Sequence, residues 1–174
     1  MEAVYFLVES VFSFAVFAFL LRVLLQLVRA DFRNPLAQAV VSLTNWLVLP
    51  LRRVLPPAGR FDTASFAALL AVQLAATLIL FRLRTGVVYP IVPLAAAALR
   101  QLANATLLLY TILIFVQAVL SFVPGARSPV TSMLGSLCEP VLRPIRRVLP
   151  VVGGLDFSPL VAILGLTALR ILLR

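Results

Sequence analysis

One short segment occurs twice in this chain: PLRRVLP at residues 50–56 and PIRRVLP at residues 144–150. Sliding the chain by 94 residues superimposes residues 33–62 on residues 127–156 without a gap, and 12 of the 30 aligned positions are identical. A match of this length predicts an internal duplication. Apolar stretches flank both copies of the motif, so we expect the duplicated unit to be larger than the motif itself.

The composition around the motif is typical of a membrane protein. Of the 174 residues, 63% are hydrophobic and 12% are charged, whereas a soluble domain has about 25% charged residues. With a mean hydropathy of +1.11, the chain has too little polar surface to cover a water-soluble globule. This balance excludes a disordered chain and an ordinary cytosolic enzyme. The single cysteine, Cys138, excludes a fold held together by internal disulfides.

Four apolar segments are long enough, or nearly long enough, to cross a hydrocarbon core, which takes about 20 helical residues. They cover residues 3–28, 64–81, 103–123 and 158–173. The first segment lacks a basic leader and a small-residue cleavage site, so we expect an uncleaved span. The apolar stretch 86–99 is short and contains Pro90 and Pro93. Two alternatives stay open for it: a surface segment, or an extension of the third helix.

The duplication divides the chain into a first repeat at residues 1–82, a connector at residues 83–102 and a second repeat at residues 103–174. Each repeat reads as a span, an amphipathic segment, the arginine motif, a glycine turn, an aspartate and a second span. Because each unit has two spans, the units should be parallel and related by an axis along the membrane normal. We therefore expect an all-α membrane protein with about four transmembrane helices in two tandem repeats, each with an amphipathic interfacial or re-entrant helix.

The segment before each motif is predicted to form that amphipathic helix. Apolar residues at helical spacing oppose a polar stripe: Leu36, Val40, Leu43 and Leu47 oppose Gln38, Ser42 and Asn45, and Val130, Leu134, Leu137 and Val141 oppose Ser132, Ser136 and Glu139. Asn34-Pro35 and Ser128-Pro129 supply a capping residue and a first-turn proline. Pro50 and Pro144 are expected to end or kink the helices. About 15 residues cover about 22 Å, so we expect these helices to lie in the interface or dip back.

An arginine pair follows each amphipathic segment, nine residues before an aspartate that opens the next span. These residues are Arg52, Arg53 and Asp62 in the first repeat, and Arg146, Arg147 and Asp156 in the second. In one interpretation the arginines bind anionic head groups, and the aspartates stabilise helix N-termini or pair with an arginine. In a second, the repeats build a duplicated site for an anionic lipid or a partner protein. In a third, they form an ion-coupling or solute site.

Further residues add a family resemblance to the doubled motif. They are Asp31-Phe32 with Asn34-Pro35, and the run GGLDFSP at residues 153–159. Together with the motif they resemble the YggT family of small bacterial inner-membrane proteins, which has chloroplast relatives. The resemblance covers nearly the whole chain. It implies an integral membrane protein associated, in different lineages, with osmotic or salt-stress tolerance, with cell division or nucleoid organisation, and with assembly of a thylakoid cytochrome. Thr63-Ala64-Ser65 stands where the family has Phe-Ser-Pro, which predicts two unequal halves.

The positions of the charges predict an orientation. All fifteen basic residues are arginines and the net charge is +9; nine arginines follow the first and third spans, against four on the other side. Because arginine gathers on the cytoplasmic side of a membrane, we expect both motifs to face the cytoplasm and both termini to face outward, in a bacterial inner membrane. Glu9 and Arg22 lie within the first span but near its ends, so we expect their side chains to snorkel to the surface.

Nothing in the sequence points to catalysis or nucleic-acid binding. The chain has no histidine, no phosphate-binding glycine loop and no metal-ligand cluster, and Cys138 has no base beside it. We therefore expect the protein not to be an enzyme and to bind no metal or cofactor. We also expect no binding of nucleic acid, because no basic stripe carries interleaved aromatic residues. The leading hypothesis is a non-enzymatic scaffold or assembly factor that engages anionic lipid and a membrane or division partner, with or without homo-oligomerisation. The alternative is a small oligomeric channel or transporter for ions or osmolytes.

Overall fold

The computed structural model describes residues 2–30, 32–56, 62–87, 90–122, 128–149 and 156–173, and within these ranges it contains six α-helices and no strand. In chain order they are α1 (Glu2–Leu27), α2 (Pro35–Val54), α3 (Thr63–Thr85), α4 (Ile91–Ser121), α5 (Pro129–Val148) and α6 (Ser158–Leu172). The all-α class predicted from the sequence is confirmed for this part of the chain.

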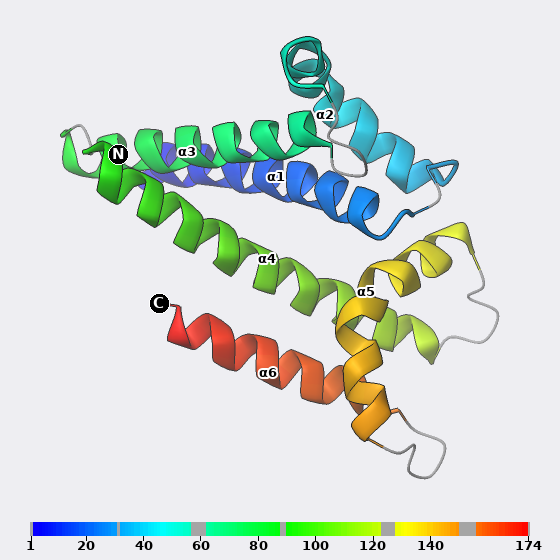
Figure 1. Ribbon diagram of the computed structural model, residues 1–174. Helices are drawn as coiled ribbons and strands as arrows, with labels where there is room; N and C mark the ends of the chain where they lie inside the picture. The colour runs from blue at the N-terminus through cyan, green and yellow to red at the C-terminus, as the bar shows by residue number, and fades with distance from the viewer. Residues whose placement is uncertain are drawn as a thin grey trace.

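The helices pack as two triplets. Helices α1, α2 and α3 contact one another, as do α4, α5 and α6, and α4 also contacts α1 and α3. Both ends of the chain lie at one end of the molecule, whereas α2 and α5 lie at the opposite end (Figure 1). Most of the connector predicted at residues 83–102 is helical: α3 continues to Thr85, and α4 begins at Ile91 and runs past the end of the connector. The duplication itself stays a prediction from the sequence.

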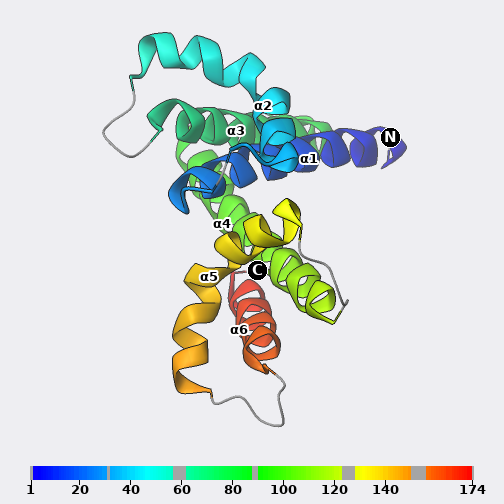
Figure 2. The ribbon, with the colours of Figure 1, turned by 90° about the vertical axis from the view of Figure 1, so that its right-hand side faces the viewer.

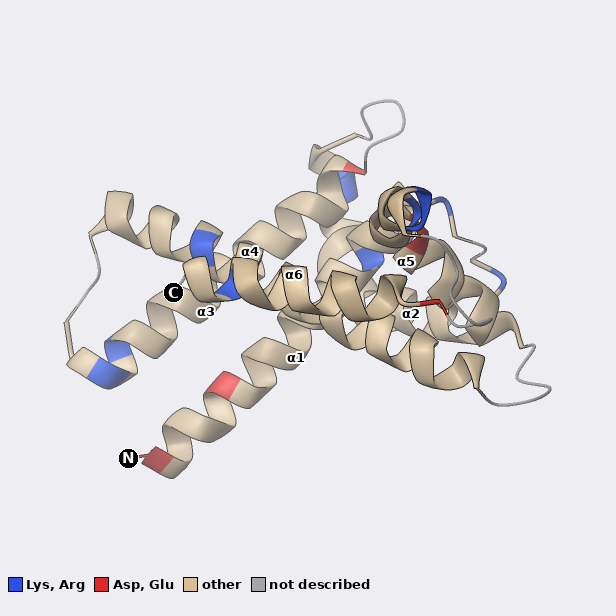
Figure 3. Cartoon of the chain, turned by 90° about the horizontal axis from the view of Figure 1, so that it is seen from below, with Lys and Arg blue, Asp and Glu red and all other residues tan. Residues whose placement is uncertain are grey.

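Three helices are long and apolar enough to cross a membrane: α1, α3 and α4, with 26, 23 and 31 residues. Helix α6 is apolar but has 15 residues, which reach about 22 Å against a hydrocarbon core of about 30 Å. Most charged residues lie near helix ends or on α2 and α5, with long uncharged stretches between them (Figure 3). The sequence predicts about four spans, and the described residues contain three of full length and a short one.

The third apolar segment begins well before residue 103. Helix α4 starts at Ile91, so most of the stretch 86–99 extends this helix and does not form a separate surface segment. Pro90 is the N-cap and Pro93 falls in the first turn, where the missing N–H removes no helical hydrogen bond. Four alanines at residues 95–98 follow, and alanine has the highest helix propensity. The prolines therefore begin α4.

Helices α2 and α5, called the motif helices below, continue through the prolines that were expected to end or kink them. Helix α2 contains Pro50 and continues to Val54, and α5 contains Pro140 and Pro144 and continues to Val148. An internal proline removes one backbone hydrogen bond and bends a helix, and both motif helices are bent in Figure 2. The arginine pairs therefore belong to the last turns of these helices.

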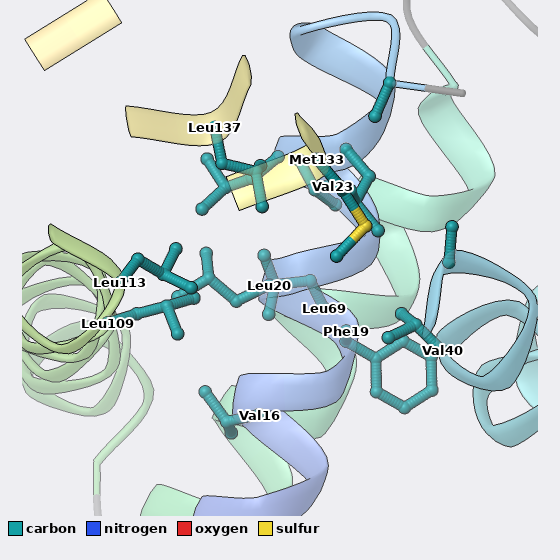
Figure 4. Packing of buried hydrophobic residues seen from close by; sticks show 14 of the residues in the cluster. Val16, Phe19, Leu20, Val23, Val40, Leu69, Leu109, Leu113, Met133 and Leu137 are labelled. Carbon is teal, nitrogen blue, oxygen red and sulfur yellow. The ribbon is translucent and has the colours of Figure 1, made fainter. Parts of the chain in front are cut away.

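The hydrophobic core is centred on α1. Figure 4 shows Val16, Leu20 and Val23 of α1 facing Leu109 and Leu113 of α4 and Met133 and Leu137 of α5, while Phe19 lies beside Val40 of α2. Phe19 also makes an edge-to-face contact with Trp46, with ring centroids 6.3 Å apart. Helix α1 packs against the other two helices of its own triplet and against α4 of the second triplet. It therefore helps to position the two motif helices relative to each other.

Candidate functional site

The first motif helix begins at Asn34, which is also in contact with the second. The Asn34 Oδ1 accepts a hydrogen bond from the Leu36 N–H at 2.9 Å, and Pro35 is the first helical residue. The side chain is buried, and its Nδ2 donates to the Pro129 carbonyl oxygen at 2.5 Å. One amide therefore caps α2 and fixes its beginning against the beginning of α5.

The second motif helix begins at Ser128 with a reciprocal cap. The Ser128 Oγ accepts from the Thr131 N–H at 3.3 Å, and the Thr131 Oγ1 accepts from the Ser128 N–H at 3.0 Å. Pro129 is the first helical residue. This capping box satisfies two backbone donors that a helix N-terminus otherwise leaves free.

A buried arginine connects the three helices of the first triplet. The Arg22 side chain on α1 is 2% exposed. Its Nε donates to Ser65 Oγ on α3 at 3.0 Å, and one terminal nitrogen donates to Thr44 Oγ1 at 2.7 Å and Asn45 Oδ1 at 2.9 Å on α2. The same nitrogen lies 3.3 Å from the Val41 carbonyl oxygen. The expectation that Arg22 snorkels to the surface is therefore wrong, because polar acceptors on two neighbouring helices hold it inside.

Asp62 extends this cluster to the first arginine motif. It is the N-cap of α3: its Oδ1 accepts from the Ser65 N–H at 3.3 Å. Its Oδ2 accepts from Ser65 Oγ at 2.8 Å and Gln26 Nε2 at 3.0 Å, and it forms an ion pair with Arg52. We call the connected side chains the junction network: Arg22, Gln26, Thr44, Asn45, Arg52, Asp62 and Ser65.

The junction network keeps Asp62 ionised. Burial by itself raises the pKa of this carboxyl, but hydrogen bonds from Arg52 and Ser65 and the charge of Arg52 outweigh it, and the pKa falls from 3.8 to about 2. At neutral pH the carboxylate therefore carries a full negative charge between two arginines, Arg22 and Arg52. This charge offsets part of the electrostatic cost of burying Arg22.

The second triplet has a related but more exposed arrangement. Arg146 Nε donates to Asp156 Oδ2 at 2.9 Å, and another nitrogen of Arg146 donates to Glu139 Oε2 at 3.2 Å. The Asp156 Oδ1 accepts from the Ser158 N–H at 2.9 Å. Burial raises the pKa of Asp156, but hydrogen bonds from Ser158 and Arg146 outweigh it and lower the pKa. The Asp156 side chain is 37% exposed, against 11% for Asp62, so this ion pair is a weaker surface contact.

No buried arginine is present at the matching place in the described part of the second triplet. Sliding the chain by 94 residues aligns Thr44 with Cys138 and Asn45 with Glu139. Gln117 of α4 is the polar side chain nearest Gly135 of α5, and its Oε1 is buried without a hydrogen-bond partner among the described residues. The shift of 94 residues places Val116 opposite Arg22, so the second triplet has no charge at the aligned position.

Cys138 is a packing residue rather than a reactive one. Its side chain is fully buried, and burial raises the pKa of the thiol to about 12. The nucleophilic thiolate is therefore essentially absent at neutral pH. Within the described ranges, no group of three or more histidine, cysteine or acidic residues could hold a metal ion.

The structure distinguishes the two arginines within each pair. The first of each pair, Arg52 or Arg146, is bound to an aspartate. The second, Arg53 or Arg147, is exposed and has no hydrogen bond or ion pair to any residue that the structure describes. An unpaired guanidinium at a helix end is available for an external anion. Of the four arginines singled out from the sequence, these two are the candidates for lipid or partner binding.

The outward faces of the motif helices differ in chemistry. On α2, the exposed residues Leu36, Leu43, Trp46 and Leu49 form an apolar face. On α5, the exposed face carries Ser132, Ser136, Glu139, Arg143 and Arg147. The buried residues of α2 are Ala37, Val40, Thr44 and Val48, so of the predicted apolar set Val40 points inward whereas Leu36 and Leu43 are exposed. Thr44 lies on the inward face and accepts a hydrogen bond from Arg22.

Sequence reasoning missed the centre of the junction network. The sequence pattern indicates a charge near a span end for Arg22, and it gives Ser65 no role beyond a departure from the family pattern. The usable signal was the spacing of Arg22 and Gln26, one helical turn apart on an otherwise apolar helix. Two polar side chains on one face of a span indicate polar partners on the neighbouring helices.

These features define a class: small all-helical proteins with long apolar helices and an arginine-bearing bent helix in each triplet. A family model described as CCB3/YggT matches residues 1–83 and 96–174, and the chain belongs to this family. It is 37% identical over 164 residues to the uncharacterized protein YggT of Escherichia coli K12, covering 94% of this chain and 85% of the relative.

Two further relatives extend the comparison. An uncharacterized protein encoded in the proC 3' region of Vibrio alginolyticus is 38% identical over 168 residues, covering 95% of this chain and 90% of the relative. The chloroplastic YlmG homolog protein 2 of Arabidopsis thaliana is 39% identical over 60 residues, covering 34% of this chain and 24% of the relative. No solved structure matches the chain.

Proposed function

We propose that the protein is a non-enzymatic scaffold or assembly factor of the bacterial inner membrane. In this proposal α1, α3, α4 and the shorter α6 cross the bilayer, both termini face outward, and the motif helices lie at the cytoplasmic surface. There they engage anionic lipid and a membrane or division protein. The observation that carries the proposal is a difference within each arginine pair. One guanidinium is bound to an aspartate, while Arg53 and Arg147 are exposed and have no partner among the described residues.

The arrangement of the helices supports this placement. Both motif helices lie at the end of the molecule opposite the two chain ends (Figure 1), so all four motif arginines gather on one side of the three long helices. The apolar outward face of α2 fits the acyl boundary of a bilayer. The polar outward face of α5 fits water or a protein partner.

The lipid part of the proposal is tested by titrating the purified full-length protein in detergent with short-chain phosphatidylglycerol or phosphatidylcholine. The variant Arg53→Gln/Arg147→Gln should bind phosphatidylglycerol roughly thirtyfold more weakly, because each arginine near an anionic surface contributes about 1 kcal/mol. The matched control is Arg82→Gln/Arg84→Gln, which removes two exposed arginines from the other end of α3. Equal loss in both variants, or none in the first, contradicts the proposed site.

The cellular part of the proposal is support of envelope integrity under osmotic or salt stress, as the family resemblance implies. A deletion strain is complemented with the wild-type chain, the Arg53→Gln/Arg147→Gln variant or the control variant, and survival is measured after a salt upshift. Photocrosslinkers placed at Ser132 and Arg143 on the outward face of α5 identify a partner directly. Full complementation by the Arg53→Gln/Arg147→Gln variant argues against a stress role that acts through these arginines.

A small oligomeric channel or transporter is a second candidate. It is favoured by polar side chains that α1, α3 and α4 direct into a groove between them. Ion and osmolyte flux into liposomes that contain the inserted protein separates the two functions, with protein-free vesicles as the control. Reproducible flux supports the transporter, and tight vesicles support the scaffold.

A further inference from the structure

A polar groove lies between α1, α3 and α4, away from the motif helices. It has a volume of about 310 Å³, and its polar lining consists of Glu9, Ser13, Gln73, Gln101 and Asn104. This volume lies at the lower end of the range for small-molecule sites, about 300–1,000 Å³. Neither the scaffold proposal nor the arginine motifs account for this cluster.

The groove lies deep along the helices that carry it. Glu9 is seven residues from the first residue of α1, which corresponds to about 10 Å. Gln73 is twelve residues from the end of α3 at Thr85, or about 18 Å. When α1 and α3 cross a bilayer, these side chains are therefore inside the hydrocarbon core. Ionisable residues at that depth are costly and mark functional sites by default.

Hydrogen bonds on one wall of the groove orient an amide oxygen. Gln73 Nε2 donates to Gln101 Oε1 at 3.0 Å and to Thr77 Oγ1 at 3.2 Å, and Thr77 Oγ1 donates to Gln101 Oε1 at 3.0 Å. The Gln73 side chain is 4% exposed, so these contacts hold it rigidly. The Gln73 amide nitrogen donates both of these hydrogen bonds, whereas its Oε1 has no hydrogen-bond partner among the described residues.

On the opposite wall, Glu9 has no ionic partner. The ion pairs in the described part of the chain do not include Glu9, and neither Glu9 nor Ser13 makes a side-chain hydrogen bond there. Arg170 of α6 donates to Asn104 Oδ1, on another side chain of the groove, at 3.0 Å. A carboxylate in a low-dielectric environment needs a positive charge beside it or else takes up a proton.

We propose that this groove binds a small monovalent cation, with Glu9 supplying the balancing charge and Ser13 Oγ and Gln73 Oε1 supplying further oxygen ligands. A single carboxylate matches one positive charge, whereas divalent cations usually take more carboxylate ligands. At about 30 Å³ per water molecule, the groove holds a partly hydrated alkali ion or a small organic ammonium ion. Phe12 and Phe17 line the same groove, and aromatic rings attract either kind of cation.

The test is equilibrium binding of radioactive sodium, rubidium and tetramethylammonium ions to the full-length protein in detergent, at constant ionic strength. One probe should bind saturably with one site per chain, and the identity of this probe distinguishes an alkali ion from an organic ammonium ion. Glu9→Gln should weaken its binding roughly tenfold or more. Glu2→Gln, which removes an exposed carboxylate outside the groove on the same helix, should leave binding unchanged.

A second variant guards against a folding defect. Ser13→Ala removes a hydroxyl that makes no hydrogen bond among the described residues, so it should preserve the fold and weaken binding several-fold. Circular dichroism and gel filtration verify all variants. Absence of saturable binding by all three ions up to about 100 mM, a limit near which binding free energies become negligible, overturns the proposal. Unchanged affinity in Glu9→Gln also overturns it, and leaves the lipid-binding proposal at Arg53 and Arg147 untouched.

Discussion

The two motif helices have the same length and place an arginine pair in the same final turn, yet α2 buries small apolar residues together with Thr44, whereas α5 buries a larger and wholly apolar set. Helix α2 turns Thr44 and Asn45 towards Arg22 and leaves leucines and Trp46 on the outside. Helix α5 buries Leu134, Leu137 and Leu142 and leaves serines and charges outside. One buried charge accounts for part of the difference: Arg22 donates to Thr44 and Asn45 of α2, while Gln38 and Ser42 of the same helix stay exposed.

The difference teaches that matching sequence segments do not imply matching surfaces. Leu43 and Leu137 are aligned and identical, but Leu43 is 53% exposed and Leu137 is fully buried. In α2 hydrogen bonds of the junction network add to the packing of Ala37, Val40 and Val48, whereas the buried face of α5 is held by hydrophobic packing. We therefore expect the two triplets to respond differently to equivalent substitutions.

The largest expected effect comes from removing the buried charge. Arg22→Met leaves Thr44, Asn45 and Ser65 without their common donor, and loss of one member of a buried network costs about 3 kcal/mol or more. Gln117→Met in α4 is the matched control and should cost less than about 1 kcal/mol, because the Gln117 Oε1 has no partner among the described residues. Unfolding in mixed detergent–SDS micelles measures both. Equal losses show that the two helices are attached in the same way.

A smaller effect is expected at the two aspartates. Asp62→Asn loses the charge that binds Arg52 and accepts from Gln26 and Ser65, and should cost about 2 kcal/mol. Asp156→Asn disrupts an ion pair whose members are more than a third exposed, and should cost less than about 1 kcal/mol. The same unfolding assay measures both variants. A larger loss in Asp156→Asn contradicts the ranking.

Acid titration sharpens this comparison. The pKa of Asp62 is lowered from 3.8 to about 2, so the folded state favours the ionised carboxyl. The resulting stability is fully present above about pH 4 and is lost as the pH falls towards 2. Wild-type protein should lose stability across this window more steeply than Asp62→Asn. Parallel curves for the two proteins contradict an ionised Asp62 in the junction network.

The smallest expected effect is a change in tryptophan fluorescence quenching, which reports whether the outward face of each motif helix lies in lipid or in water. Trp46 is the single tryptophan of the chain and is 68% exposed on α2. If this face lies in lipid, lipids brominated near the carbonyl end of their chains should quench its fluorescence more than aqueous iodide does. The variant Trp46→Phe/Pro140→Trp moves the tryptophan to the aligned position on α5 and should reverse this preference. Iodide quenching of Trp46 in vesicles contradicts the membrane placement of α2.

Much of the fold follows from local sequence properties. Apolar runs longer than about 20 residues predict membrane-crossing helices wherever they occur, and Asn34-Pro35 and Ser128-Pro129 mark helix starts through short-range capping chemistry. The arginine pairs and the aspartates were also visible as candidates. Of the two outcomes expected for Pro50 and Pro144, the helices bend and do not end, because the packing of the motif helices against their neighbours outweighs the hydrogen bond that each proline removes.

The sequence by itself determined the helical class, the apolar spans, the family and the doubled motif, because these depend on composition and on contacts within a few residues. The tertiary structure alone decided that Arg22 is buried, that Arg52 is bound to Asp62 while Arg53 has no partner among the described residues, and that α2 and α5 present different faces. Each of these depends on contacts between residues at least ten positions apart or on the rotation of one helix against another. The pattern of apolar and polar side chains along a helix limits the rotations that it can adopt against its neighbours. Among these, the structure adopts the rotation that gives buried polar groups hydrogen-bond partners across the helix interface.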